Sequence, residues 1–153
     1  MSAIVQEVFL ILALTLLNGF FSGAEVAMLS ARKTRLRELA DDGNRSAREA
    51  LLLRAEPERF LATVQVGITV VSATAAAFGG AVLEEPIAAG LQRLGAPGAR
   101  TVALVVVIAL VSFLSVVLGE LVPKSLALRH AERATLLVAR PLSALSRLAT
   151  PVV

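Results

Sequence analysis

The 153-residue chain contains no cysteine, tryptophan or tyrosine, and each absence narrows what the protein can be. Without cysteine there is neither a disulfide nor a thiolate metal site. Without tryptophan and tyrosine, the aromatic belt that usually marks the membrane–water boundary is missing. Charged residues are scarce at 18%, where soluble domains carry roughly 25%. The sequence has no phosphate-binding loop, no HExxH motif and no nucleophile–base pair, so we do not expect an enzyme.

Long apolar stretches are the main feature of the sequence. Hydrophobic residues make up 56% of it, and charges are absent from Val8–Ala24, Phe60–Leu83 and Thr101–Gly119. A helix that crosses the hydrocarbon core of a bilayer needs about 20 apolar residues, so each stretch is a credible span. A soluble helical bundle rarely needs three such stretches. We therefore predict an all-α membrane protein with transmembrane helices at about 4–31, 59–83 and 100–122.

Basic residues predict the orientation of these spans. None lies in residues 1–7 and two lie between the second and third spans, whereas eight lie between the first two and five follow the third. Because basic residues concentrate on the cytoplasmic side, we expect the N-terminus outside the cell (inner) membrane and the C-terminus in the cytoplasm. Juxtamembrane amphipathic helices at about 33–55 and 126–149 are expected to meet lipid headgroups there. The net charge of +3 therefore needs no nucleic acid as a partner.

Two of the predicted spans carry a polar stripe on one helix face, with the spacing i, i+4, i+7. The stripes consist of Asn18, Ser22 and Glu25 in the first span, and of Gln65, Thr69 and Ser72 in the second, with Gly67 nearby. Gly19 and Gly23 lie beside the first stripe, and small residues at this spacing let another helix approach closely. Hydroxyls alone often only join helices, and a carboxylate near a span's end can reach water by snorkelling.

The end of the third span combines a carboxylate with a proline. Pro123 has no N–H, so the carbonyl of Gly119 loses its helical donor, and at membrane depth such a carbonyl needs another partner. Glu120 adds an anionic oxygen beside it, and Lys124 is placed to pair with that carboxylate. A simple helix exit at the membrane surface explains the same residues. The other interpretation is a site for a hard cation such as Mg²⁺, Ca²⁺ or Na⁺, which prefer oxygen ligands.

Three segments carry a resemblance to a known family. They are NGFFSGAEVAMLSARKTRL at 18–36, QVGITVVS at 65–72 and GELVPKSLALRHAE at 119–132. Together they resemble the transmembrane domain of the CorC/CNNM family of magnesium transporters, and the resemblance covers residues 1–153. It implies a homodimer with three spans per chain and a cytoplasmic belt of helices. In this family cytoplasmic CBS domains that bind ATP normally follow; they are absent from this chain and are expected as partners in a full-length one.

The resemblance also implies a function, namely Mg²⁺ export coupled to Na⁺ entry through a site between the spans. The metal ligands it implies are Ser22, Gly67, Thr69, Ser72, Gly119 and Glu120, supported by Asn18, Glu25, Gln65, Pro123 and Lys124. Vertebrate members have Asn where this chain has Ile68, which leaves Thr69, Ser72 or Gln65 as the second-span ligand. The alternative is a membrane anchor and dimerisation scaffold for a cytoplasmic regulatory or hemolysin-like module. A scaffold should tolerate Glu120→Gln, whereas a cation site should not.

Overall fold

The structure is a computed structural model that describes residues 3–95 and 97–149, with side chains described except at 3–4, 80–82 and 148–149. Every regular element in this part of the chain is helical. In chain order the elements are α1 (Ala3–Ser30), α2 (Lys33–Asp41), α3 (Arg45–Ala55), α4 (Pro57–Arg93), α5 (Ala99–Val116), the π-helix η1 (Val117–Leu121), α6 (Val122–Arg129) and α7 (Ala131–Ala149).

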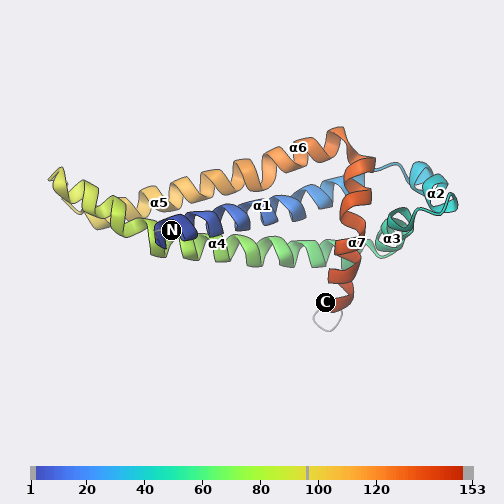
Figure 1. Ribbon diagram of the computed structural model, residues 1–153, viewed down its shortest axis with the longest axis horizontal. Coiled ribbons are helices and arrows are strands. Elements are labelled where there is room, and N and C mark those ends of the chain that lie inside the picture. The colour runs from blue at the N-terminus through green and yellow to red at the C-terminus, as the bar shows by residue number, and fades with distance from the viewer. Residues whose placement is uncertain (1–2, 96, 150–153) are drawn as a thin grey trace.

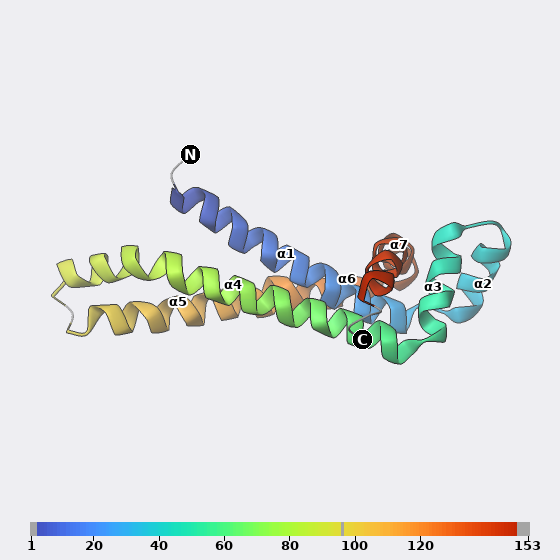
Figure 2. The ribbon, with the colours of Figure 1, turned by 90° about the horizontal axis from the view of Figure 1, so that it is seen from below.

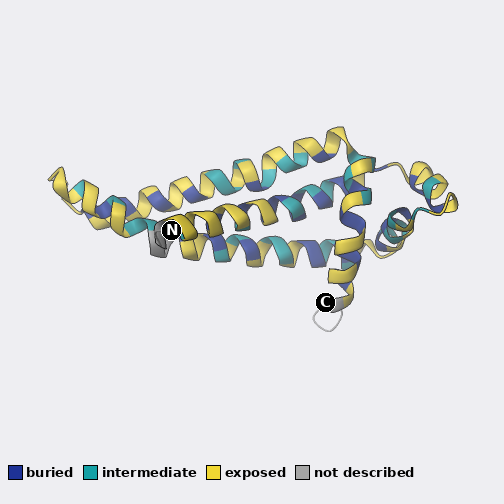
Figure 3. Cartoon of the chain, viewed as in Figure 1, coloured by how far each residue is buried: buried dark blue, intermediate teal, exposed yellow. Residues whose placement is uncertain are grey.

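Three helical stretches are long and apolar enough to cross a membrane: Val5–Ser30, Pro57–Arg93 and Ala99–Arg129. They correspond to α1, to α4, and to α5, η1 and α6 in succession, and they run along one another (Figure 1). Many of their residues are exposed (Figure 3), and these include large apolar side chains such as Phe9, Leu16 and Phe113, as expected of helices in contact with lipid. The prediction of a helical fold with three helices long and apolar enough to span a membrane is confirmed for the described residues.

The second span continues beyond the segment predicted from the sequence. α4 contains 37 residues, which makes it about 55 Å long, against a hydrocarbon core of about 30 Å. It begins with Pro57, whose fixed φ suits a first helical turn, and runs through Pro86 to Arg93. Gly95 and Gly98 have positive φ in the turn to α5. α4 and α5 then form a hairpin from which the N-terminal end of α1 diverges (Figure 2).

The predicted helical segment at 33–55 is two helices. Gly43, with φ of 91°, separates α2 from α3, and the side chain of Asn44 accepts a hydrogen bond from the N–H of Ala47 at 3.1 Å, capping α3. Nη1 of Arg54 donates to the carbonyl of Ala31, one of the carbonyls left without a helical partner where α1 ends. α3 packs on α2 and on α7, and Arg54 ties it to the residue that follows α1.

The apolar core lies where the spans meet α7. In Figure 1, α7 runs across the spans near the end that carries α2 and α3. The buried side of α7 includes Thr135, Val138, Ala139 and Leu142, spaced i, i+3, i+4 and i+7. The core cluster also contains Phe21, Ala24, Met28, Ala31, Leu36, Ala50, Leu53, Phe60, Val64 and Val71. This end of the molecule therefore has a packed apolar core like that of a soluble domain, which fixes how the three spans are arranged relative to α7.

The small-residue pair of α1 brings a helix of the same chain close. A Cβ added at Gly19 would lie 2.8 Å from Cγ of Pro123, and one added at Gly23 would lie 3.4 Å from Cβ of the same proline. α6 packs on α1 along this stripe, as small residues in membrane helices permit. The stripe is thus occupied within one protomer and gives no support to an interface between two copies.

Candidate cation site

The third span changes its helical geometry just before Pro123. Residues Val117–Leu121 form η1, and the N–H of Val122 donates to the carbonyl of Val117, five residues back. Pro123 has no N–H, so the usual four-residue hydrogen bond to the carbonyl of Gly119 cannot form. Single π-turns inside α-helices are frequent at functional sites. The turn leaves Gly119 buried against α1.

Asn18 connects all three spans at this turn. Its Nδ2 donates to the carbonyl of Gly119 at 3.1 Å, and its Oδ1 accepts from Oγ of Ser72 at 3.1 Å. Asn18 is 5% exposed, so its amide is satisfied by protein rather than by bulk water. A Cβ at Gly119 would lie 3.0 Å from Nδ2 of Asn18 and 3.2 Å from the carbonyl oxygen of Thr15. The carbonyl of Gly119, which has no helical donor because of Pro123, is therefore hydrogen-bonded by Asn18 of α1 instead.

A cavity of about 310 Å³ lies between α1, α4, α5 and η1. Its polar lining consists of Asn18, Ser72, Ser112, Ser115 and Glu120, and its apolar lining of Ile68, Ala75, Ala76, Val111 and Val116. Amide, hydroxyl and carboxylate oxygens are the ligands that hard cations prefer. Ser112 and Ser115 were not among the sequence-predicted residues, although their i, i+3 spacing on the third span places both on one face.

The carboxylate of the cavity is paired with a neighbouring lysine. Nζ of Lys124 lies 2.7 Å from Oε1 of Glu120, and the two side chains are 33% and 47% exposed. The i, i+4 ion pair expected from the sequence therefore forms. It balances the charge of Glu120 in the absence of a cation, and an arriving cation has to compete with an ammonium group for the same oxygens.

The structure separates the remaining predicted residues from the cavity. Gly67 packs on α1, because a Cβ there would lie 2.8 Å from the ring of Phe21. Gln65 and Thr69 are exposed on α4, and Glu25 is half-buried on α1. Ser22 is 1% exposed, and among the residues that the structure describes its hydroxyl finds no hydrogen-bond partner. Of the second-span candidates, only Ser72 faces the cavity.

The arrangement limits the chemistry that the site can support. Within residues 3–95 and 97–149, no group of three or more His, Cys, Asp or Glu side chains comes together. A metal ion in the cavity would therefore have one carboxylate, with neutral oxygens and water completing its shell. Mg²⁺ usually keeps several of its waters and binds proteins through one or two carboxylates, so this ligand set suits it.

A family model for the cyclin M transmembrane N-terminal domain (CNNM) matches residues 9–153. The chain belongs to the CNNM transmembrane domain family. It is 41% identical, over 99% of its length, to the UPF0053 protein sll0260 of Synechocystis sp., of which it covers 34%. It is 34% identical, over 90% of its length, to the UPF0053 protein YhdT of Bacillus subtilis, of which it covers 30%.

A third relative is the UPF0053 inner membrane protein YfjD of Escherichia coli. The chain is 29% identical to it over 76% of its own length and covers 24% of the relative. The chain thus spans about a third or less of the length of these curated relatives. Family membership and the three apolar helices together make this CNNM domain a multi-pass membrane domain, and the resemblance noted in the sequence is confirmed.

Proposed function

We propose that this CNNM domain carries Mg²⁺ across the inner membrane, exporting it in exchange for Na⁺ entry, through the cavity between its spans. The observation that carries this proposal is the carboxylate of Glu120, a residue of the π-turn that lines the cavity. A charged group well inside a membrane costs at least about 2.5–3.5 kcal/mol on insertion scales, and such groups usually mark ion paths. The domain acts as a transporter and not as an enzyme.

Binding would begin with the exchange of one cation for another at Glu120. Lys124 occupies Oε1 of that carboxylate, and Mg²⁺, with twice the charge of an ammonium group, competes for it more strongly than Na⁺ does. Ser72 and Asn18 lie on the facing spans and supply neutral oxygens. Ser22, one turn from Asn18 on α1 with an unsatisfied hydroxyl, is a further ligand once the helices shift. Lys124 thus returns to Glu120 when the ion leaves.

The proposal includes an orientation and an assembly. The N-terminus lies outside, and α2, α3 and α7 form an amphipathic belt at the cytoplasmic face, from which the CBS domains of a longer chain continue. Arg133, Arg140 and Arg147 are exposed on α7, which crosses the ends of the spans (Figure 1) and suits a helix lying on anionic lipid. Two such domains form the homodimer. A mass of two chains in lipid nanodiscs supports the dimer, and a mass of one chain contradicts it.

The deciding experiment removes the charge of Glu120 while keeping its shape. A cation that binds only the folded protein stabilises it, by about 2.7 kcal/mol at a concentration of 100 Kd. We expect Mg²⁺ to raise the unfolding temperature of the wild type and to have no effect on Glu120→Gln. Glu25→Gln is the matched control, because it makes the same change on α1 outside the cavity. It should respond to Mg²⁺ like the wild type.

The scaffold alternative rests on a specific observation as well. Asn18 hydrogen-bonds both Gly119 and Ser72, so these polar groups demonstrably hold the spans together. If that were their whole role, Glu120→Gln would fold normally and bind Mg²⁺ as the wild type does. Equal Mg²⁺ stabilisation of the two proteins would therefore replace the transport proposal with an anchor for a cytoplasmic module.

A further inference from the structure

A second hollow, separate from the cation cavity, lies between α1, α6 and α7. Its volume is about 400 Å³, and its lining includes Gly19, Pro123, Leu126, His130, Arg133 and Leu137. Most of this lining is apolar. Leu126 and Leu137 at its edge are 56% and 78% exposed. We call this hollow the apolar groove. At membrane depth, a hollow with an apolar lining and exposed leucines at its edge favours an apolar occupant.

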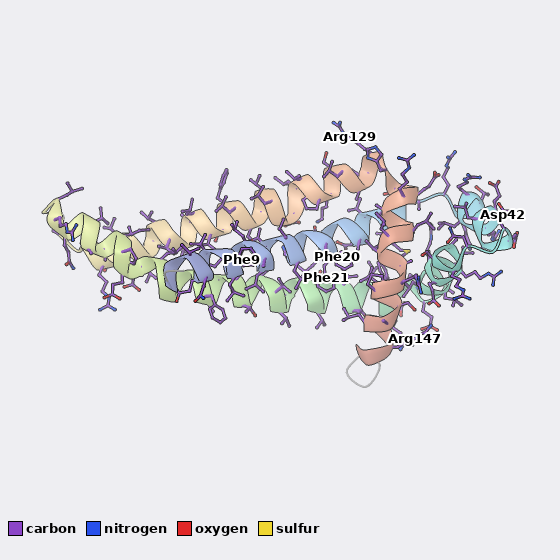
Figure 4. All side chains as sticks on the ribbon, in the orientation of Figure 1. Phe9, Phe20, Phe21, Asp42, Arg129 and Arg147 are labelled. Atoms are coloured by element: carbon purple, nitrogen blue, oxygen red, sulfur yellow. The ribbon has the colours of Figure 1, made fainter. Side chains whose placement is uncertain are left out.

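A basic hollow adjoins the apolar groove at the junction of α6 and α7. Its volume is about 440 Å³, and its lining is Ser30, Arg32, Leu128, Arg129, His130, Ala131, Glu132 and Arg133. We call it the basic pocket. His130 and Arg133 line both hollows, so the two adjoin each other at these side chains. In Figure 4, Arg129 lies at this junction, at the end of the spans where the charged side chains gather.

The basic pocket carries an excess of positive charge. Arg32 and Glu132 form an ion pair at 2.7 Å, and the hydrogen bond from Arg32 lowers the pKa of the Glu132 carboxyl below its usual value. These two side chains therefore stay ionised and neutralise each other. Arg129 and Arg133 have no ion-pair partner among the residues that the structure describes. Two guanidinium groups at one end of an apolar groove suit a phosphate, which arginine binds through paired N–H donors.

We propose that the apolar groove and the basic pocket form one binding site for an anionic phospholipid of the leaflet beside α7. The phosphate lies between Arg129 and Arg133, and an acyl chain follows the groove past Pro123 toward Gly19. A free phosphate would leave the groove uncovered, and an apolar helix of a second copy would leave the two arginines without a counter-charge. A phospholipid fits both parts of the site, because its acyl chain is apolar like the groove and its phosphate is opposite in charge to the basic pocket. It also covers the α1–α6 contact at Pro123, the residue that creates the π-turn of the cation site.

The test measures lipid retention by native mass spectrometry, with phosphatidylglycerol and phosphatidylcholine of identical acyl chains offered in equal amounts. The wild type should retain one phosphatidylglycerol per chain in preference to phosphatidylcholine. Removing both arginines with Arg129→Gln/Arg133→Gln should lower phosphatidylglycerol retention about 30-fold, since each basic residue near an anionic surface contributes on the order of 1 kcal/mol. The matched control is Arg93→Gln/Arg100→Gln, which removes the same charge from exposed positions at the α4–α5 end of the molecule, outside both hollows and away from α7. It should retain lipid like the wild type.

Two further measurements distinguish a bound phospholipid from the other possible occupants of the site. Leu137→Ser should weaken retention of both lipids, whereas Leu145→Ser, on the same helix outside the groove, should not. Glycerol 3-phosphate at the lipid concentration should not displace the lipid. The proposal is overturned if the wild type retains both lipids equally, if the control pair loses as much as the arginine pair, if glycerol 3-phosphate competes fully, or if lipid leaves when two chains associate. Unfolding temperatures without added lipid show whether each variant has kept its fold.

Discussion

At the residue scale, Asn18 has a constraint that ordinary core residues lack. It is nearly fully buried, and both halves of its amide bond to other spans. The carbonyl of Gly119 can only accept, so Nδ2 must face it, which leaves Oδ1 for the hydroxyl of Ser72. One side chain therefore sets the separation of α1, α4 and η1. A cation that takes Oδ1 as a ligand has to take it from Ser72, so binding and helix packing are coupled at this residue.

Ser72 and Thr69 give the first prediction at this scale. Ser72 lines the cavity, whereas Thr69 is exposed on α4. Ser72→Ala removes one neutral ligand and one hydrogen bond, which is typically worth about 0.5–1.5 kcal/mol, so Mg²⁺ affinity should fall roughly two- to tenfold. Thr69→Val should leave it unchanged. Isothermal titration with Mg²⁺ measures both, and a larger loss for Thr69→Val would move the second-span ligand to Thr69.

The contact between Gly19 and Pro123 gives the second prediction at the residue scale. A Cβ at Gly19 would meet the proline ring at 2.8 Å, which requires α6 to move, whereas at Gly23 the corresponding distance of 3.4 Å is ordinary contact. Overpacking of this kind costs about 1–3 kcal/mol. We expect Gly19→Ala to lower the free energy of unfolding by that amount and Gly23→Ala to lower it less. Unfolding in mixed detergent micelles compares the two; equal stability of Gly19→Ala and the wild type would contradict the close contact.

The sequence predicted the chemistry of the candidate site better than its geometry. The spacing of Gln65, Thr69 and Ser72 shows that they share a face of α4, but spacing does not give the rotation of the helix. Packing sets that rotation, because Gly67 admits the ring of Phe21 and leaves only Ser72 of the three facing the cavity. Glu120 and Pro123 were recognisable in advance, since an intramembrane carboxylate and a missing N–H have consequences at any rotation.

At the element scale, the apolar stretches were sufficient to place the three spans. They did not predict where the helices end. The second span was expected to end before Glu84 because charges begin there. Charged residues do not end a helix, however, and α4 continues because it packs on α5. A Cβ at Gly79 would lie 2.8 Å from Val111, and Glu84 pairs with Arg100 at 2.7 Å. Contacts between distant segments of this kind cannot be read from local composition.

The π-turn gives a prediction at the same scale. Pro123→Ala restores an N–H four residues after Gly119, so an ordinary α-helical hydrogen bond can form there and compete with Asn18 for that carbonyl. Loss of the π-turn would rotate Glu120 relative to α1. We expect unchanged helix content by circular dichroism and a marked loss of Mg²⁺-dependent stabilisation. Wild-type stabilisation of Pro123→Ala by Mg²⁺ would show that the turn does not position the carboxylate.

At the scale of the whole molecule, burial and charge are distributed unevenly along the spans. The apolar core lies where α1 and α4 meet α7, α2 and α3. Toward their far ends the spans have many exposed residues (Figure 3), among them Phe9, Phe78 and Val105. The charged side chains gather at the packed end, with Asp42 at its tip and Arg147 on α7 (Figure 4). Because basic residues concentrate on the cytoplasmic side of membrane proteins, the packed end should face the cytoplasm.

This orientation can be tested at two exposed positions at opposite ends of the molecule. Because the chain has no cysteine, Asp42→Cys and Pro97→Cys each introduce a unique thiol. Position 42 avoids the positive φ of Gly43, and Pro97 lies in the turn between α4 and α5. In intact cells a membrane-impermeant maleimide should label Pro97→Cys, whereas Asp42→Cys should react only after permeabilisation. The opposite pattern would place α7 outside the cell and contradict the proposed orientation.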